Sequence, residues 1–268
     1  MSTPAPLLGR AALITGGGRG IGAAVAHALA EAGASVVVAS RTAREIEAVA
    51  GQLRERGHRA HSVVCDVADE AAVEELARRA EGLVGPVDTL VLAAGHGAAA
   101  PFERLSVAEW RAMMDAHATG TFLCARALVP GMRARGFGRV IAIASTAGLE
   151  GARYISHYCA AKHAVVGFVR AIACELEGSG VTTHALCPGY VDTPMTEQTL
   201  EKVMARTGRS REAALAAVLH AAGQERLLRA DEVASAALTL ALPGPEASTH
   251  HGRAIALLPQ GDQCQWKW

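Results

Sequence analysis

The sequence predicts one α/β domain built on a doubly wound parallel sheet of about seven strands, with helices on both faces. Three observations lead to this fold class. The chain has 268 residues, enough for one large domain with a buried core. Short β-branched runs alternate with longer helical segments, which implies right-handed βαβ crossovers in one parallel sheet. No repeat and no linker rich in Pro, Gly or Ser divides residues 1–268, so we expect a single domain.

The elements alternate regularly from the first strand onward. Half of the residues are hydrophobic and only 4% are aromatic, as expected where Ala-, Val- and Leu-rich helices pack on both faces of a parallel sheet. β-Branched runs predict strands at 11–15, 35–39, 60–65, 89–94, 139–144, 181–187 and 254–258. Helical patterns predict helices near 21–32, 43–56, 69–81, 106–133, 155–177 and 231–241.

One segment interrupts this alternation. Residues 194–223 form a polar, helix-prone insertion where a short connection would suffice. It follows the carboxyl end of a strand, where ligands bind in such sheets. We therefore favour a lid over the substrate; the alternative is a solvated amphipathic helical hairpin.

Charge and cysteine usage exclude several classes. Lys plus Arg and Asp plus Glu number 26 each, so nothing in the net charge favours nucleic acid or an acidic membrane as partner. With no basic leader and no apolar run of the roughly 20 residues that span a bilayer, we expect a cytoplasmic protein. Six scattered cysteines without a CxxC pair predict reduced core thiols, with neither a disulfide framework nor a metal site.

A glycine-rich loop joins the first strand to the first helix. Gly16, Gly20 and Gly22, with Ile21 between the last two, let the backbone turn sharply and approach a pyrophosphate. The helix N-terminus that follows offers partial positive charge to the same anion. Such a motif alone is weak, but its place in the first βα unit predicts dinucleotide binding.

The end of the second strand indicates which dinucleotide is bound. An acidic residue there favours NAD, whereas this chain has Ser40 and Arg41, with Arg19 in the glycine-rich loop. Two guanidinium groups suit the 2′-phosphate of NADP, so we favour NADP and keep NAD as the alternative. Asp66, after the third strand, is placed either to meet the adenine amino group or to cap the helix near 69.

A phenol and an ammonium lie one helical turn apart in Tyr158-Cys-Ala-Ala-Lys162. A nearby ammonium, together with an oxidised nicotinamide, is expected to lower the tyrosine pKa from about 10 and make the phenol an acid/base. Ser145, at the end of the preceding strand, is placed to donate a hydrogen bond to the same substrate carbonyl.

The glycine-rich loop, Ser145, Tyr158, Lys162 and Pro188-Gly189, in this order, resemble the short-chain dehydrogenase/reductase family over essentially the whole chain. The resemblance implies a Rossmann-type fold and hydride transfer at nicotinamide C4. It implies that Ser145 polarises the carbonyl, Tyr158 exchanges the proton and Lys162 binds the nicotinamide ribose. Beside Tyr158 and Lys162, the expected cofactor contacts are Gly16, Arg19, Gly20, Ile21, Gly22, Ser40, Arg41, Asp66, Val67, Ala94, Gly95, Pro188, Gly189, Val191 and Thr193.

Three positions depart from the family pattern. Ala93 replaces an Asn that braces the sheet, and Leu258-Pro-Gln-Gly replaces a C-terminal Gly-Gly before Trp266-Lys-Trp268. His117 replaces the active-site Asn whose neighbourhood holds a relay water in the family. We count His117 among the catalytic residues, because histidine titrates near neutral pH; the alternative is a packed histidine with one satisfied bond.

Within the family, residues 131–140, 144–148, 161–168 and 187–195 resemble β-ketoacyl reductases and aromatic polyketide ketoreductases. Ala147 and Ile155 stand where hydroxybutyrate dehydrogenases grip a carboxylate, and Gly136 and Ser179 where carrier-protein arginines lie, which disfavours both substrates. We expect an NADP-dependent ketoreductase acting on a 3-oxoacyl thioester. The alternatives are a dehydrogenase of alicyclic or aromatic secondary alcohols and a silent dinucleotide-binding scaffold.

The substrate pocket and the assembly are predicted more coarsely. The resemblance implies a homotetramer formed through the helices near 106–133 and 155–177. The expected wall residues of the pocket are His96, Glu150, Tyr154, His157, Tyr190 and Met195.

Overall fold

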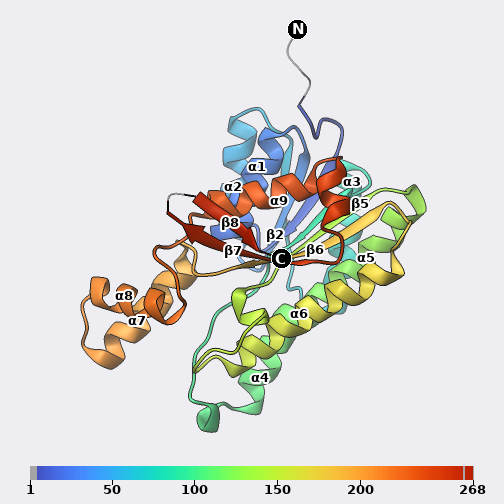
Figure 1. Ribbon diagram of the computed structural model, residues 1–268. Coiled ribbons are helices and arrows are strands. Elements are labelled where there is room, and N and C mark those ends of the chain that lie inside the picture. The colour runs from blue at the N-terminus through green and yellow to red at the C-terminus, as the bar shows by residue number, and fades with distance from the viewer. Residues whose placement is uncertain (1–4, 262, 268) are drawn as a thin grey trace.

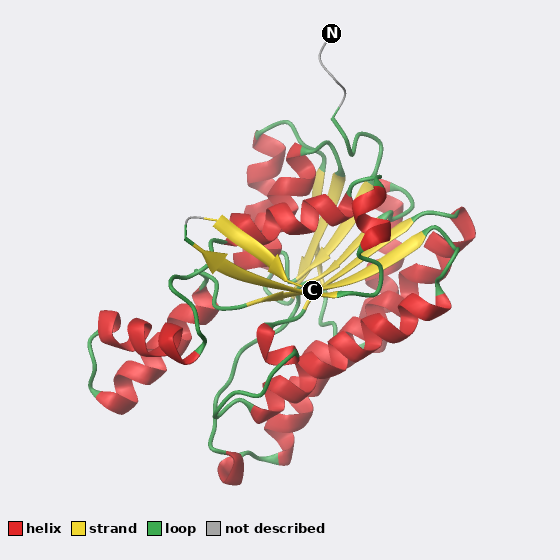
Figure 2. Ribbon diagram, in the orientation of Figure 1, coloured by secondary structure: helices red, strands yellow, loops and turns green. Residues whose placement is uncertain are grey.

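The computed structural model describes residues 5–261 and 263–267, and in these residues the strands form one sheet (Figures 1 and 2). The strand order is β3-β2-β1-β4-β5-β6-β7-β8, with the first seven strands parallel. Residues 11 and 13 of β1 face one core, and residues 12 and 14 face the other. The strands are β1 (Ala11–Thr15), β2 (Ser35–Ser40), β3 (Ala60–Val64), β4 (Thr89–Leu92), β5 (Gly138–Ile143), β6 (Val181–Pro188), β7 (Ala254–Gln260) and β8 (Gln263–Lys267).

Helices cover both faces of the sheet, as predicted. One core contains residues of α1 (Gly20–Glu31), α2 (Ala43–Glu55) and α9 (Ala230–Ala241). The other contains residues of α3 (Glu70–Val84), α5 (Gly120–Arg135) and α6 (Ser156–Glu175). A short helix, α10 (Pro245–Thr249), leads to β7. The sheet order reverses between β1 and β4, so the carboxyl ends of these two strands flank the expected ligand crevice.

The described sheet has one strand more than the about seven predicted, at its C-terminal end. β8 pairs antiparallel with β7, with Leu257 opposite Trp266, and Trp266 packs against the first core. The sequence of β8, Gln-Cys-Gln-Trp-Lys, has no β-branched residue and therefore resembled a tail. Its register is set by the neighbouring edge strand. Trp268 lies outside the described residues.

The single helix expected over 106–133 is two helices. α4 (Val107–Met114) ends in a π-helical segment, Asp115–Thr119, and α5 begins at Gly120. A π-helical turn widens the helix locally, and such turns occur frequently at functional sites. His117 lies in the middle of this segment.

The insertion at 194–223 forms two helices, α7 (Pro194–Thr207) and α8 (Arg211–Ala221), which extend away from the sheet in Figure 1. Thr193 and Ser210 cap their N-termini. Arg211 forms a bidentate ion pair with Glu197 that joins the two helices. Of the free cysteines, Cys174 is exposed on α6, which corrects its prediction as a core thiol.

No helix within the described ranges is long and apolar enough to cross a bilayer. Among those same residues, no group of three His, Cys, Asp or Glu side chains is arranged to hold a metal ion.

Candidate active site

The glycine-rich loop is packed so closely that side chains would not fit. A Cβ on Gly16 would lie 2.5 Å from the Ala93 carbonyl oxygen, and one on Gly22 would lie 2.2 Å from the Gly16 carbonyl oxygen. The loop therefore requires glycine at these two positions for space, and Gly16 also has a left-handed φ of +66°. Gly20 faces Thr193, whose Cγ2 would lie 3.3 Å from an added Cβ.

The N-terminus of α1 has no side-chain cap, as is also true of α2 and α6, whereas α3, α7 and α8 are capped by Asp69, Thr193 and Ser210. The first turn of α1 also contains no acidic residue. Its backbone N–H groups and positive helix end are therefore open to an external anion. A loop filled by backbone and an uncapped helix end fit a dinucleotide pyrophosphate.

The expected ribose and adenine contacts lie near the carboxyl ends of β1, β2 and β3, where Arg19, Arg41 and Asp66 are exposed and Ser40 is half-buried. Arg41 Nη1 lies 3.8 Å from Asp66 Oδ2, and Arg19 Nη1 lies 3.6 Å from Glu45 Oε1. The Ser40 hydroxyl accepts a hydrogen bond from Thr42 N–H. Asp69, not Asp66, caps α3, so the capping role considered for Asp66 is wrong.

Further expected contacts lie after β3 and β4 and in the first turn of α1. Val67 packs against Gly120, where a Cβ would lie 2.7 Å from Val67 Cγ2. Thr15 is buried, and its hydroxyl links the Val91 carbonyl to the Ala94 N–H at 3.4 Å each. Thr15 thus supplies a side-chain link between β1 and β4 next to Ala93, whose methyl group can form no hydrogen bond. Ile21 is half-buried and packs against the first core.

Three of the four expected catalytic side chains, Ser145, Tyr158 and Lys162, converge. Ser145 follows β5 and begins a 3-10 turn, where its Oγ accepts a hydrogen bond from Ala147 N–H at 3.1 Å. A side-chain hydrogen bond joins Ser145 to Tyr158. The Nζ of Lys162, in the next turn of α6, lies 5.7 Å from the Tyr158 ring centroid. Both hydroxyl groups can therefore reach one substrate oxygen.

The expected lowering of the tyrosine pKa is wrong for the chain by itself. Burial raises the pKa of Tyr158 to about 12, and the hydrogen bond with Ser145 only partly opposes it. The Lys162 Nζ instead donates to the Ile143 carbonyl oxygen at 2.7 Å, and burial lowers the pKa of Lys162 to about 8. Low polarity disfavours both charged forms, so the phenol is harder to ionise and the ammonium gives up its proton more readily than in water.

His117 is buried beside these residues. Its ring lies over Gly95, where an added Cβ would be 2.1 Å from Cε1, and it meets the Tyr158 ring edge-on at 5.4 Å between centroids. Nε2 lies 2.8 Å from the His96 carbonyl oxygen and 3.1 Å from the His96 nitrogen. Nδ1 has no hydrogen-bond partner among the described residues. Burial, reinforced by Lys162, holds the pKa of His117 well below 6.5, so the ring is neutral.

The expected nicotinamide contacts follow β6. Pro188 ends the strand, Gly189 and Tyr190 come next, and Val191 forms an isolated bridge with Leu228. The Val191 carbonyl oxygen accepts hydrogen bonds from the Thr193 and Thr196 hydroxyls at 3.3 and 2.6 Å.

The expected pocket residues do not form one wall. Met195 of α7 lies close to Gly97 in the loop after β4, where an added Cβ would be 3.3 Å from Met195 Cγ. Glu150 and Tyr154 are exposed, and Tyr154 has a left-handed φ of +67°. His157 is buried within α6, and His96 and Tyr190 are half-buried.

Sequence reasoning missed Gln224, a buried side chain bonded to the backbone of Tyr190. A glutamine after an amphipathic helix is normally solvated, so no local signal distinguishes it. Its burial depends on the return of the chain from α8 to the sheet.

Comparison with known proteins agrees with this geometry. A cis-4-hydroxycyclohexanecarboxylate dehydrogenase of Sinomonas cyclohexanicum is 41% identical over 187 residues, 69% of this chain and 75% of that protein. A 3-oxoacyl acyl-carrier-protein reductase of Synechocystis is 37% identical over 192 residues, 71% of this chain and 78% of that protein. The crystal structure of a variant actinorhodin polyketide ketoreductase with NADPH is 32% identical and has a TM-score of 0.86, covering 96% of this chain and 97% of that one.

A family model described as short chain dehydrogenase matches residues 10–204, which include the glycine-rich loop, Ser145, Tyr158 and Lys162. The chain therefore belongs to the short-chain dehydrogenase/reductase family.

Proposed function

We propose that this chain is an NADP-dependent ketoreductase that transfers a hydride between the nicotinamide and a ketone or secondary alcohol. The observation that carries the proposal is the convergence of Ser145 and Tyr158 beside Lys162, at the carboxyl end of a sheet whose first helix is uncapped. The polyketide ketoreductase of similar structure, determined with NADPH, supports the choice of cofactor.

The catalytic roles follow from the geometry. Ser145 Oγ and Tyr158 Oη bind the carbonyl oxygen, and Tyr158, whose raised pKa keeps it protonated at neutral pH, delivers the proton. Reduced nicotinamide, when bound, supplies the hydride. Lys162, whose pKa of about 8 leaves it mostly charged at pH 7, stabilises the phenolate that remains.

Changing Tyr158 to Phe tests this mechanism. The phenyl ring keeps the packing against His117 but has no proton to give, so turnover should fall on the order of 10²–10⁴-fold, the usual range for a general acid/base. NADPH binding, measured by fluorescence titration, should be kept. Near-parental turnover by the phenylalanine variant would rule out Tyr158 as the proton donor.

A 3-oxoacyl thioester is the substrate that we favour. The named 3-oxoacyl reductase relative supports it. The cis-4-hydroxycyclohexanecarboxylate dehydrogenase relative favours an alicyclic alcohol as the second candidate. NADPH consumption with acetoacetyl-CoA and with cyclohexanone derivatives separates the two. A non-catalytic dinucleotide-binding scaffold would consume no NADPH with either substrate.

We also propose that 194–223 acts as a lid and that the protein is a cytoplasmic homotetramer. Phe122 on α5 is exposed, and its ring lies 6.2 Å from that of Phe168 on α6, which supports association through these helices. A molar mass of four chains by light scattering tests the assembly.

A further inference from the structure

Gln224 is buried where α8 returns to the sheet, with 7% of the residue exposed. The Tyr190 backbone N–H donates to Gln224 Oε1 at 2.6 Å. Gln224 Nε2 donates to the Tyr190 carbonyl oxygen and to the Arg226 carbonyl oxygen, at 3.2 Å each. Both N–H groups and the carbonyl of the amide are thus used. A buried amide is costly unless it is satisfied in this way, so the side chain is specific to this place.

The Gln224 amide fills the space next to Gly189. A Cβ on Gly189 would lie 2.4 Å from Gln224 Oε1 and 2.7 Å from Gln224 Cδ. Gly189 has no left-handed φ, so its requirement for glycine here is one of space, not of conformation. Gln224 therefore occupies the volume that any other residue at 189 would fill.

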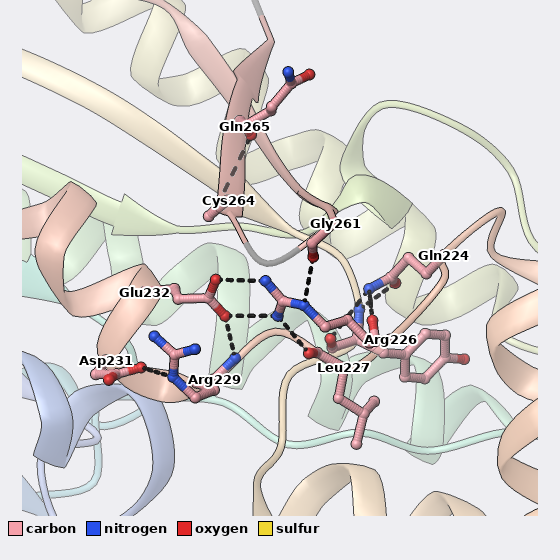
Figure 3. Close-up of polar contacts among 10 residues, drawn as sticks. Gln224, Arg226, Leu227, Arg229, Asp231, Glu232, Gly261, Cys264 and Gln265 are labelled. Carbon is pink, nitrogen blue, oxygen red and sulfur yellow. Dashed lines mark hydrogen bonds and ion pairs between the residues drawn. The ribbon is translucent and has the colours of Figure 1, made fainter.

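The segment that carries Gln224 is itself held to the sheet. Arg226 forms a bidentate pair with Glu232 of α9, at 2.8 and 2.9 Å, and its Nε donates to the Gly261 carbonyl oxygen at 3.0 Å (Figure 3). Leu228 adds backbone bonds to the Tyr190 carbonyl oxygen and from Asp192 N–H. The segment that carries Gln224 is thus bonded to α9 and to the turn between β7 and β8.

We propose that Gln224 is a positioning residue that holds the Gly189–Tyr190 backbone as one wall of the nicotinamide site and joins that wall to the end of the lid. The proposal rests on the function proposed above, because the wall matters only if a nicotinamide lies against it. Without the amide, Tyr190 N–H loses its partner and the wall is free to shift. Cofactor binding then weakens while Ser145, Tyr158 and Lys162 stay in place.

Gln224→Leu and Gln224→Glu test the proposal, with Gln265→Glu as control. Leucine has a similar volume but no hydrogen bond, and glutamate keeps the acceptor for Tyr190 N–H but loses both donors. Gln265 is an exposed glutamine on β8, directed away from Arg226 in Figure 3. The dissociation constant of NADPH should rise about tenfold in the leucine variant, as expected for a lost buried hydrogen bond, and at least as much in the glutamate variant, whose buried carboxylate would face the Tyr190 and Arg226 carbonyl oxygens. The KM for the ketone should stay at the parental value in both Gln224 variants. The Gln265→Glu control should keep the parental dissociation constant for NADPH.

A merely structural role would lower the melting temperature and the folded fraction without changing NADPH affinity per folded molecule. Unchanged affinity in both Gln224 variants, in a parent that binds NADPH, overturns the proposal for Gln224 alone. A parent that binds no NADPH overturns the proposed function instead.

A double-mutant cycle with Gly189→Ala keeps the test valid if the leucine variant does not fold. Melting temperatures are measured without cofactor. Gly189→Ala should lower the melting temperature of the parent strongly. It should lower that of the Gln224→Ala variant much less, because the clash is relieved there. An equal fall in melting temperature in both backgrounds would show that Gln224 is not the reason why residue 189 must be glycine.

Discussion

Arg41→Asp should change the cofactor preference from NADPH toward NADH. The Arg41 side chain is 70% exposed, and its nearest carboxylate, on Asp66, lies 3.8 Å away. Such an exposed pair is worth about 0–1 kcal/mol, so little holds the guanidinium back from a phosphate. A hydrogen bond to a charged group is worth about 1.5–3 kcal/mol. The phosphate is therefore the stronger partner.

The expected change in preference follows from these values. Losing about 1.4 kcal/mol or more of net phosphate binding lowers kcat/KM with NADPH about tenfold or more. The new carboxylate can accept a hydrogen bond from the ribose hydroxyl, for a gain of about 0.5–1.5 kcal/mol with NADH, which the charge of Asp66 reduces. The ratio of the two efficiencies should thus shift by about 20-fold or more.

The assay is the ratio of kcat/KM with NADPH and with NADH, at low and at high salt. Arg44→Asp is the matched control, because Arg44 is exposed three residues further on and undergoes the same change of charge. Salt should reduce the NADPH preference of the parent, since exposed charges are screened. A ratio in Arg41→Asp that equals that of Arg44→Asp would refute the role of Arg41 and make NAD the better assignment.

Three further predictions concern the lid and two buried histidines. Residues 194–223 should gain protection from hydrogen exchange when NADPH and a ketone bind, and equal protection in both states would mean a static hairpin. Burial keeps the His117 imidazole neutral, so the expectation that it titrates near neutral pH is wrong. His117→Leu, which loses the ring contact with the His96 backbone, should therefore lower activity without moving the acid limb of the pH–rate profile, and a leucine variant with parental activity would exclude a role for the imidazole. Burial lowers the pKa of His184 to about 3, so below pH 6.5 the unfolded chain binds a proton that the folded one does not. The free energy of unfolding should therefore fall by about 1.4 kcal/mol per pH unit from this group as pH drops toward 3, and His184→Asn, followed by urea unfolding, should remove that slope; an unchanged slope would contradict the buried, neutral state.

Much of the fold was predictable because its signals are local. Strand and helix order follow from apolar periodicity, which each segment carries by itself. The glycine-rich loop and the Tyr158–Lys162 spacing are also local, so the sequence alone indicated the cofactor type, the proton donor and the family. The strand β8 was not predicted because its five residues carry no strand signal, and they form a strand only by pairing with β7.

Tertiary structure alone decided the properties that depend on distant residues meeting. Thr15 links β1 to β4 where Ala93 cannot, and Gln224 reaches Tyr190 across 34 positions of the chain. Spacing placed an ammonium near Tyr158, but only the fold showed that Lys162 donates to a backbone carbonyl and that burial raises the pKa of Tyr158 in the chain without a nicotinamide. Burial and hydrogen-bond partners are set by how segments pack together, and no local pattern encodes them.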